Sequence, residues 1–186
     1  MKPIQICQTL GAERLNAYYA ELSGKELRDV LRAGGASVNV PPTAYTQAAR
    51  RNAWRRRFDA EFTSGNQQLA MALLLEWLLR HHRAMLVDYL DFLEVKHTMG
   101  ETDEDFLKTR DEDRLRAGFE HLLGTYPAHE VATYMLLVGH IQESTVFDRT
   151  PAVLRAAGMD EAAAAAHAAE AEAREAKAGG AVASAS

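Results

Sequence analysis

Five arginines surround one tryptophan in the segment ARRNAWRRRF, residues 49–58. Guanidinium groups bind carboxylates and phosphates through paired hydrogen bonds, so this segment could bind a polyanion or an acidic partner. Each helical residue turns by about 100°, which spreads the arginines around the helix and gives no single basic face. The candidate binding residues are Arg50, Arg51, Trp54, Arg55, Arg56 and Arg57.

The segment ETDEDFLKTRDED, residues 101–113, is densely acidic and complements the arginines. We expect 50–57 to dock beside 101–113, within the fold or across a subunit interface. Binding to nucleic acid and a plain solvated face are the alternatives. Pairs of residues four apart, Arg55 with Asp59 and Arg57 with Glu61, add about 0.3 kcal/mol each.

Two pairs of residues have the spacing of metal ligands. Glu94 and His97 form an E-x-x-H pair, and His140 and Glu143 form the reverse order. Di-iron bundles use two E-x-x-H pairs and two further glutamates, whereas this sequence has one such pair. These four residues are therefore the candidates for a metal site, but the pattern favours a core or helix-end role for His97, and we predict no cofactor.

Other residues that could do chemistry have simpler interpretations. His82 shares an apolar stripe with Leu86, which predicts a core-edge histidine with one polar partner. Cys7 has no histidine near it in the sequence, and there is no glycine-rich phosphate loop and no G-x-S-x-G motif. The sequence thus gives no support for catalysis.

Composition limits the compartment and the class of partner. The 186 residues are 47% hydrophobic and carry a formal charge of −5, so the chain is not strongly basic, as a dedicated nucleic-acid binder would be. A single cysteine excludes an internal disulfide framework. We see no signal peptide, and the apolar run at 69–79 is too short for a bilayer and is interrupted by Glu76. These features predict a soluble, cytoplasmic protein with no membrane contact.

Helix signals dominate the chain. We expect an all-α fold, an irregular helical bundle organised on one long central helix at about 66–97. Predicted boundaries include the arginine-rich helix at 43–62, capping boxes at Ser23–Glu26 and Ser64–Gln67, and a new helix capped by Asp111. The predicted domain is 1–158, followed by an alanine-rich helical extension at 159–178 and a disordered tail at 179–186. The extension has few large side chains to bury, so we expect it to project from the domain.

The predicted function is that of a non-catalytic protein–protein interaction or assembly module. The helices at 66–79 and 131–141 are apolar on nearly all sides, which predicts that they are core neighbours and favours a homo-oligomer or a subunit of a larger complex. Two alternatives stay open: a subunit that binds the nucleic-acid backbone through Arg50–Arg57, and a carboxylate–histidine metal enzyme.

Overall fold

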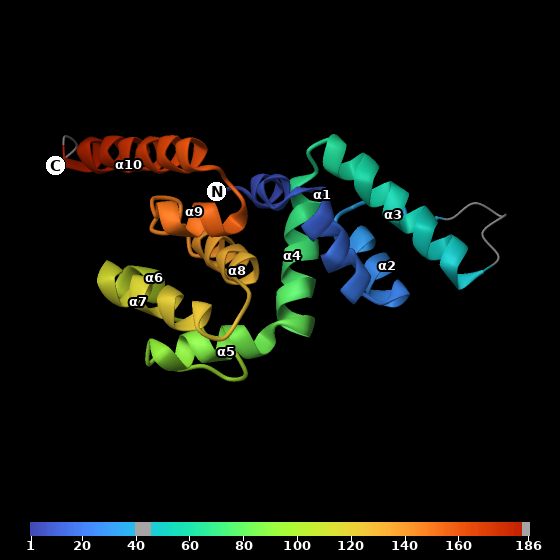
Figure 1. Cartoon of the computed structure of the whole chain (residues 1–186), viewed down its shortest axis with the longest axis horizontal. Helices are drawn as coiled ribbons and strands as arrows, with labels where there is room; N and C mark the ends of the chain where they lie inside the picture. Colours follow the sequence, from blue (N-terminus) through green and yellow to red (C-terminus); the bar gives the residue numbers. More distant parts are fainter. Residues whose placement is uncertain (40–45, 184–186) are drawn as a thin grey trace. The chain divides into compact units, whose positions relative to one another are not determined.

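A computed structural model describes residues 1–39 and 46–183, with side chains to residue 176. These residues form ten helices and no strand, apart from an isolated bridge between Thr98 and Glu101 (Figure 1). The predicted all-α fold is confirmed. Backbone contacts divide the chain into two compact units. The N-terminal unit is Lys2–Arg83, and the C-terminal unit is Ala84–Ser186 together with Met1. The domain limits expected from the sequence stay a prediction.

Four helices make up the N-terminal unit: α1 (Pro3–Glu21), α2 (Gly24–Ala33), α3 (Gln47–Thr63) and α4 (Gln67–His81). Helix α1 contains a kink at Gly11, which has φ 74° and ψ 168°. Helices α1, α2 and α3 all pack on α4. Their shared core contains Tyr19, Leu22, Leu27, Val30, Leu31, Phe58, Leu69 and Leu73. A Cβ on Gly34 would lie 2.6 Å from Leu69 Cα, so only glycine permits this approach of α2 to α4.

The helix boundaries follow capping chemistry. Ser23 and Glu26 form the predicted capping box, with Ser23 Oγ accepting from Glu26 N at 3.2 Å. The predicted box at Ser64 is wrong, because Asn66 is the cap of α4 and its Oδ1 accepts from Leu69 N at 2.9 Å. Thr46 caps α3 through Ala49 N. The earlier part of that predicted helix, 43–45, lies outside the described residues.

The long central helix is not confirmed. Helix α4 ends at His81, His82 has φ −124° and ψ 22°, and a separate helix, α5 (Arg83–Phe92), follows. The His82 side chain bonds to Glu21 Oε2 at 2.9 Å and lies over the Trp77 ring, 4.2 Å between centroids. Helix α5 then ends before 97, because Glu94 takes a left-handed φ of 57° and Val95 N donates to Leu90 O.

The C-terminal unit is built around one buried helix. It contains α5 and five further helices: α6 (Phe106–Thr109), α7 (Glu112–Leu123), α8 (Ala128–Ile141), α9 (Pro151–Ala157) and α10 (Glu161–Ala183). Residues 131–139 of α8 are all buried, and α8 packs on α7 and α9. The predicted break near Arg110 and the Asp111 cap, which accepts from Arg114 N at 2.8 Å, are confirmed.

The two strongly apolar helices, at 66–79 and 131–141, belong to different units, and each packs on helices of its own unit. The expectation that they are neighbours in a single core therefore has no support. Helices α1, α2 and α3 pack on the first, and α7 and α9 pack on the second. Among the described residues, the large apolar side chains left exposed are Met99, Leu123 and Ile141. The homo-oligomer was predicted because a monomer was expected to leave a large apolar surface exposed, and the described residues show no such surface. The homo-oligomer itself stays an untested prediction.

The alanine-rich helix α10 packs along α9, beside which it runs in Figure 1. Its buried residues are Ala164, Ala168 and Ala171, three or four residues apart and therefore on one face. The predicted projection of 159–178 is wrong, because small side chains allow close approach of the two helix backbones. The helix also continues through Ala183, where the sequence predicts disorder from 179. Residues 184–186 lie outside the described part.

Candidate functional site

The arginine-rich helix α3 has one face in the core. Phe58 is buried, and Trp54 and Phe62 pack partly buried against the same cluster. Phe58 lies 4.9 Å from the Tyr19 ring and 6.2 Å from the Phe62 ring, between centroids. The stripe of three aromatic residues on α3 therefore fixes how this helix is rotated, and that rotation decides where each arginine points.

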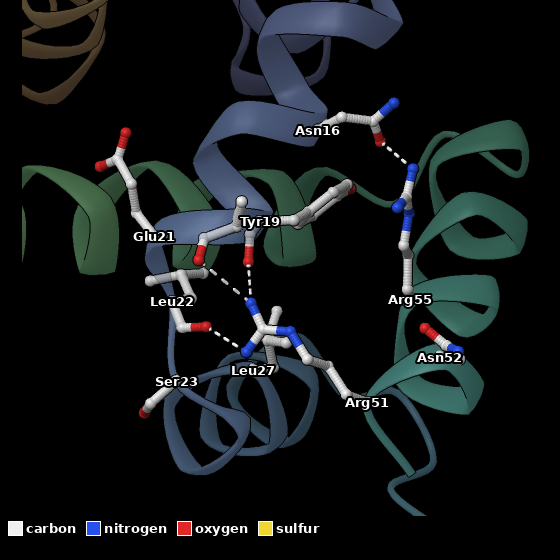
Figure 2. A pocket seen from close by; sticks show the side chains of 10 residues that line it. Asn16, Tyr19, Glu21, Leu22, Ser23, Leu27, Arg51, Asn52 and Arg55 are labelled. Carbon is white, nitrogen blue, oxygen red and sulfur yellow. Dashed lines mark hydrogen bonds between the residues drawn. The ribbon is translucent and has the colours of Figure 1, made fainter. Parts of the chain in front are cut away.

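Arg51 binds the end of another helix (Figure 2). Its Nη1 donates to Leu22 O at 2.6 Å, and its Nη2 donates to Tyr19 O at 2.7 Å and to Ala20 O at 3.2 Å. These carbonyls belong to the last turn of α1, which has no intrahelical donors left for them. Arg51 thus caps α1 and is half-buried in doing so.

Two other arginines also have partners in the N-terminal unit. Arg55 Nη2 donates to Asn16 Oδ1 at 2.6 Å, so the predicted pair with Asp59 is not formed as a salt bridge. Arg57 forms the predicted pair with Glu61, at 2.9 Å. Neither contact involves the acidic segment.

Several carboxylates of 101–113 have partners in the C-terminal unit. Glu104 binds Arg110 at 2.7 Å, Asp105 binds Lys108 at 3.1 Å, and Glu112 binds both Arg116 and Arg149. Because both charged segments are bonded locally, the expected docking of 50–57 beside 101–113 has no support in these contacts.

Arg50 and Arg56 are exposed. On a helix, Arg50, Trp54 and Arg57 fall within about 60° of one another, whereas Arg56 lies about 120° from Arg50. Arg56 makes no ion pair or side-chain hydrogen bond with any described residue. Arg50 contributes to a pocket beside Trp54.

We name this cavity the Trp54 pocket. It measures about 350 Å³ and is lined by Gly24, Lys25, Arg28, Gln47, Arg50 and Trp54. Three cationic residues, from α2 and α3, therefore line one pocket together with Trp54, and none of the lining residues is acidic. Asp29 Oδ1 lies 3.5 Å from Arg28 Nε. Trp54 Nε1 donates to Val38 O at 3.1 Å, which holds the ring in place.

Lys25 and Arg28 were not expected as site residues. The sequence feature that points to them is the difference in charge between the two halves of the chain. Residues 2–83 contain twelve Lys and Arg against seven Asp and Glu, a net charge of +5. Residues 84–186 contain nine Lys and Arg against nineteen Asp and Glu, a net charge of −10. The overall value of −5 therefore conceals a basic N-terminal unit, in which α2 as well as α3 contributes cations.

A second pocket, of about 530 Å³, lies between α1, α2 and α3 and includes Arg51 and Arg55 (Figure 2). Both guanidinium groups here are bonded to α1. The Tyr19 hydroxyl is buried and has no hydrogen-bond partner in the described residues, and burial raises the pKa of Tyr19. The polar groups of this pocket therefore mainly join helices, unlike those of the Trp54 pocket.

The predicted metal candidates have other roles. His97 Nε2 lies 3.1 Å from Asp91 Oδ1, and its Nδ1 accepts from Gly100 N at 3.1 Å, so both ring nitrogens have a partner nearby in the chain. Glu94 and Glu143 are exposed and both have left-handed φ values. Burial lowers the pKa of His140. Over the described ranges, no three His, Cys, Asp or Glu side chains form a group that could hold a metal ion.

The remaining candidate groups are structural. His82 has a polar partner, Glu21, in keeping with a core-edge histidine. Cys7 is buried, and desolvation raises the pKa of its thiol to about 12, so very little thiolate forms near neutral pH.

Comparisons with known proteins give no relative: no family model, no curated protein and no solved structure matches the chain. None of the helices in the described residues is both long enough and apolar enough to cross a bilayer.

Proposed function

We propose that this chain is a cytoplasmic, non-catalytic binding module that holds an acidic segment of a protein partner on its N-terminal unit. The binding surface, which we name the basic face, consists of Lys25, Arg28 and Arg50 beside Trp54. The Trp54 pocket is the observation that carries the proposal, because cations from α2 and α3 meet there with no lining carboxylate.

Charge and rigidity support this assignment. The unit that bears the basic face has a net charge of +5, which attracts an acidic segment from a distance. Trp54 is bonded through its indole N–H to Val38 O, so the aromatic wall is ordered before binding. A partner of this kind makes the chain a subunit of a larger complex, and it requires no exposed apolar patch.

Nucleic acid is the second candidate, because a single strand also binds cations next to an aromatic ring. A protein segment is favoured because Arg51 and Arg55 are bonded to α1 and Arg57 is paired with Glu61. Fewer arginines then remain to follow a chain of phosphates. The metal-enzyme alternative gains no support from Glu94, His97, His140 or Glu143.

The test is binding of a fluorescent oligoglutamate peptide, followed by anisotropy, to the full chain and two matched variants. We expect binding that weakens with added salt and that falls about tenfold in Arg50→Gln. Arg56→Gln removes the same charge from the same helix, about 120° away, and should bind like the wild type. Equal losses in the two variants, or no binding at low salt, would refute the proposal. Tighter binding of an oligonucleotide than of the peptide would favour nucleic acid.

A further inference from the structure

We infer that the acidic partner of the basic face is a second copy of this chain, whose residues 99–105 dock beside Trp54. We name residues 99–105 the acidic edge. This inference rests on the proposed function and names the partner that the basic face binds. The basic face belongs to the N-terminal unit and the acidic edge to the C-terminal unit, so every copy carries both surfaces.

The acidic edge presents three carboxylates to solvent. Exposure alternates along it, because Glu101, Asp103 and Asp105 are exposed, whereas Thr102 and Glu104 are half-buried. Thr102 Oγ1 accepts from Glu104 N at 3.1 Å, which holds the two half-buried residues together. Successive side chains of an extended segment point to opposite sides, so the exposed carboxylates follow one another about 6–7 Å apart on one side.

Both surfaces have charges without partners in the described part of the chain. Glu101 and Asp103 make no ion pair and no side-chain hydrogen bond with any described residue, and the same holds for the exposed Lys25. Asp105 binds Lys108 at 3.1 Å. Charges are screened beyond about 8 Å at physiological ionic strength. These local charges, rather than the net charge of the whole chain, therefore determine whether the two surfaces attract each other.

The basic face is spread over two helices, which suits an extended occupant. Lys25 and Arg28 lie on α2, and Arg50 lies on α3. Carboxylates in a row can each approach a different cation, so this docking needs no single point at which the cationic nitrogens meet. Complementary charges arranged along a surface also fix the orientation of the partner.

An exposed methionine stands at the start of the acidic edge. Met99 is 64% exposed, the highest value among the large apolar side chains of the described residues. Its φ of 53° is a left-handed conformation that costs free energy in a residue with a Cβ. Two hydrogen bonds between the backbones of Thr98 and Glu101, at 2.9 Å and 3.0 Å, close the turn. The turn therefore holds Met99 in an unfavourable conformation that leaves its side chain in solvent.

Gly100 fixes the same turn on α5. A Cβ on Gly100 would lie 2.7 Å from Leu86 Cδ2, and the Gly100 amide donates to His97 Nδ1 at 3.1 Å. An ordered edge loses little conformational freedom when it binds. The basic face offers Met99 a partner in the half-buried Trp54, because a thioether packs favourably on an aromatic ring. The two surfaces are thus complementary in apolar as well as charged groups.

The experiment measures the mass of the full chain in solution by sedimentation velocity over a range of concentrations. We expect self-association that weakens with added salt. Lys25→Glu and Asp103→Lys should each weaken it about tenfold, because an attraction becomes a repulsion. The matched controls, Arg56→Glu on α3 and Glu120→Lys on α7, reverse the same charges at other exposed positions and should leave it unchanged. Far-UV circular dichroism checks that every variant stays helical.

A mixture of two variants tests the contact itself. The Lys25→Glu copy keeps its acidic edge and the Asp103→Lys copy keeps its basic face, so an equal mixture should associate more tightly than either variant alone. Met99→Gln, which changes no charge, should weaken self-association about threefold. No recovery in the mixture, or full-strength association of Met99→Gln, would overturn the inference.

The remaining outcomes separate this inference from the proposed function. If the chain stays monomeric at every concentration but binds the oligoglutamate peptide, the acidic partner is another protein, so the inference is wrong and the proposed function stands. Self-association that neither charge reversal weakens uses a different surface, and it also overturns the inference. If the chain neither associates nor binds the peptide, both are wrong.

Discussion

Arg51 stabilises the end of a helix that lies 29 residues earlier in the chain. Its guanidinium group donates to the carbonyls of Tyr19, Ala20 and Leu22. No sequence pattern predicts such a bond, because every residue type has a backbone carbonyl. From the sequence alone, Arg51 and Arg56 are both candidate binding residues. The structure separates a structural arginine from an exposed one.

Arg51→Ala should therefore destabilise the N-terminal unit by about 2 kcal/mol, since hydrogen bonds from a charged donor to three carbonyls are lost. Arg56→Ala, which removes no such bond, should have an effect close to zero. Urea unfolding followed by circular dichroism measures both. Equal midpoints for the two variants would contradict the capping role of Arg51.

Glu26 supplies a prediction that depends on pH. The hydrogen bond from the Ser23 amide to its carboxylate, at 2.6 Å, lowers the pKa of Glu26 in the folded chain. A group with a lowered folded-state pKa stabilises the fold above its unfolded pKa of about 4.3, and loses this effect as the pH falls through the folded value.

Glu26→Gln should thus cost about 0.5–1 kcal/mol at pH 7 and almost nothing at about pH 3. Glu13→Gln, an equal charge change at an exposed position of α1, should show no such pH dependence. Unfolding midpoints at the two pH values give the comparison. A cost for Glu26→Gln that persists unchanged at low pH would show that the charge is not what stabilises the cap.

Capping signals predict the helix ends well, and apolar periodicity predicts the buried faces. The caps at Ser23 and Asp111 and the stripe of Trp54, Phe58 and Phe62 all follow from local chemistry. The failures come from contacts that are distant in sequence. The break at His82 depends on Glu21 and Trp77, and the docking of α10 depends on alanines, which carry no strong hydrophobic signal.

The packing of α10 on α9 can be tested with adjacent residues. Ala168 is 6% exposed and Ala169 is exposed. Ala168→Glu would bury a carboxylate against α9 and should cost about 2 kcal/mol or more, whereas Ala169→Glu should change stability by less than about 0.5 kcal/mol. Thermal unfolding of the full chain measures the difference. Equal melting temperatures would mean that α10 is not docked in solution.

Over the whole molecule, charge is divided between the two units, with +5 on residues 2–83 and −10 on residues 84–186. The pI of about 5.8 is an average over both halves, so it does not show that residues 2–83 are basic. The sequence identifies Arg50 and Trp54 as candidate binding residues. It does not reveal Lys25 and Arg28, because the packing of α2 against α3 brings them to the same pocket.

The most direct test of the basic face is a titration of the ¹⁵N-labelled full chain with the oligoglutamate peptide, followed by NMR. The chain has two indole N–H groups, those of Trp54 and Trp77, and Trp77 is fully buried away from the Trp54 pocket. We expect the Trp54 indole signal and the amides of Lys25 and Arg50 to shift together, while the Trp77 indole signal stays in place. Shifts confined to residues 84–183, or no shift at Trp54 under saturating peptide, would contradict this expectation.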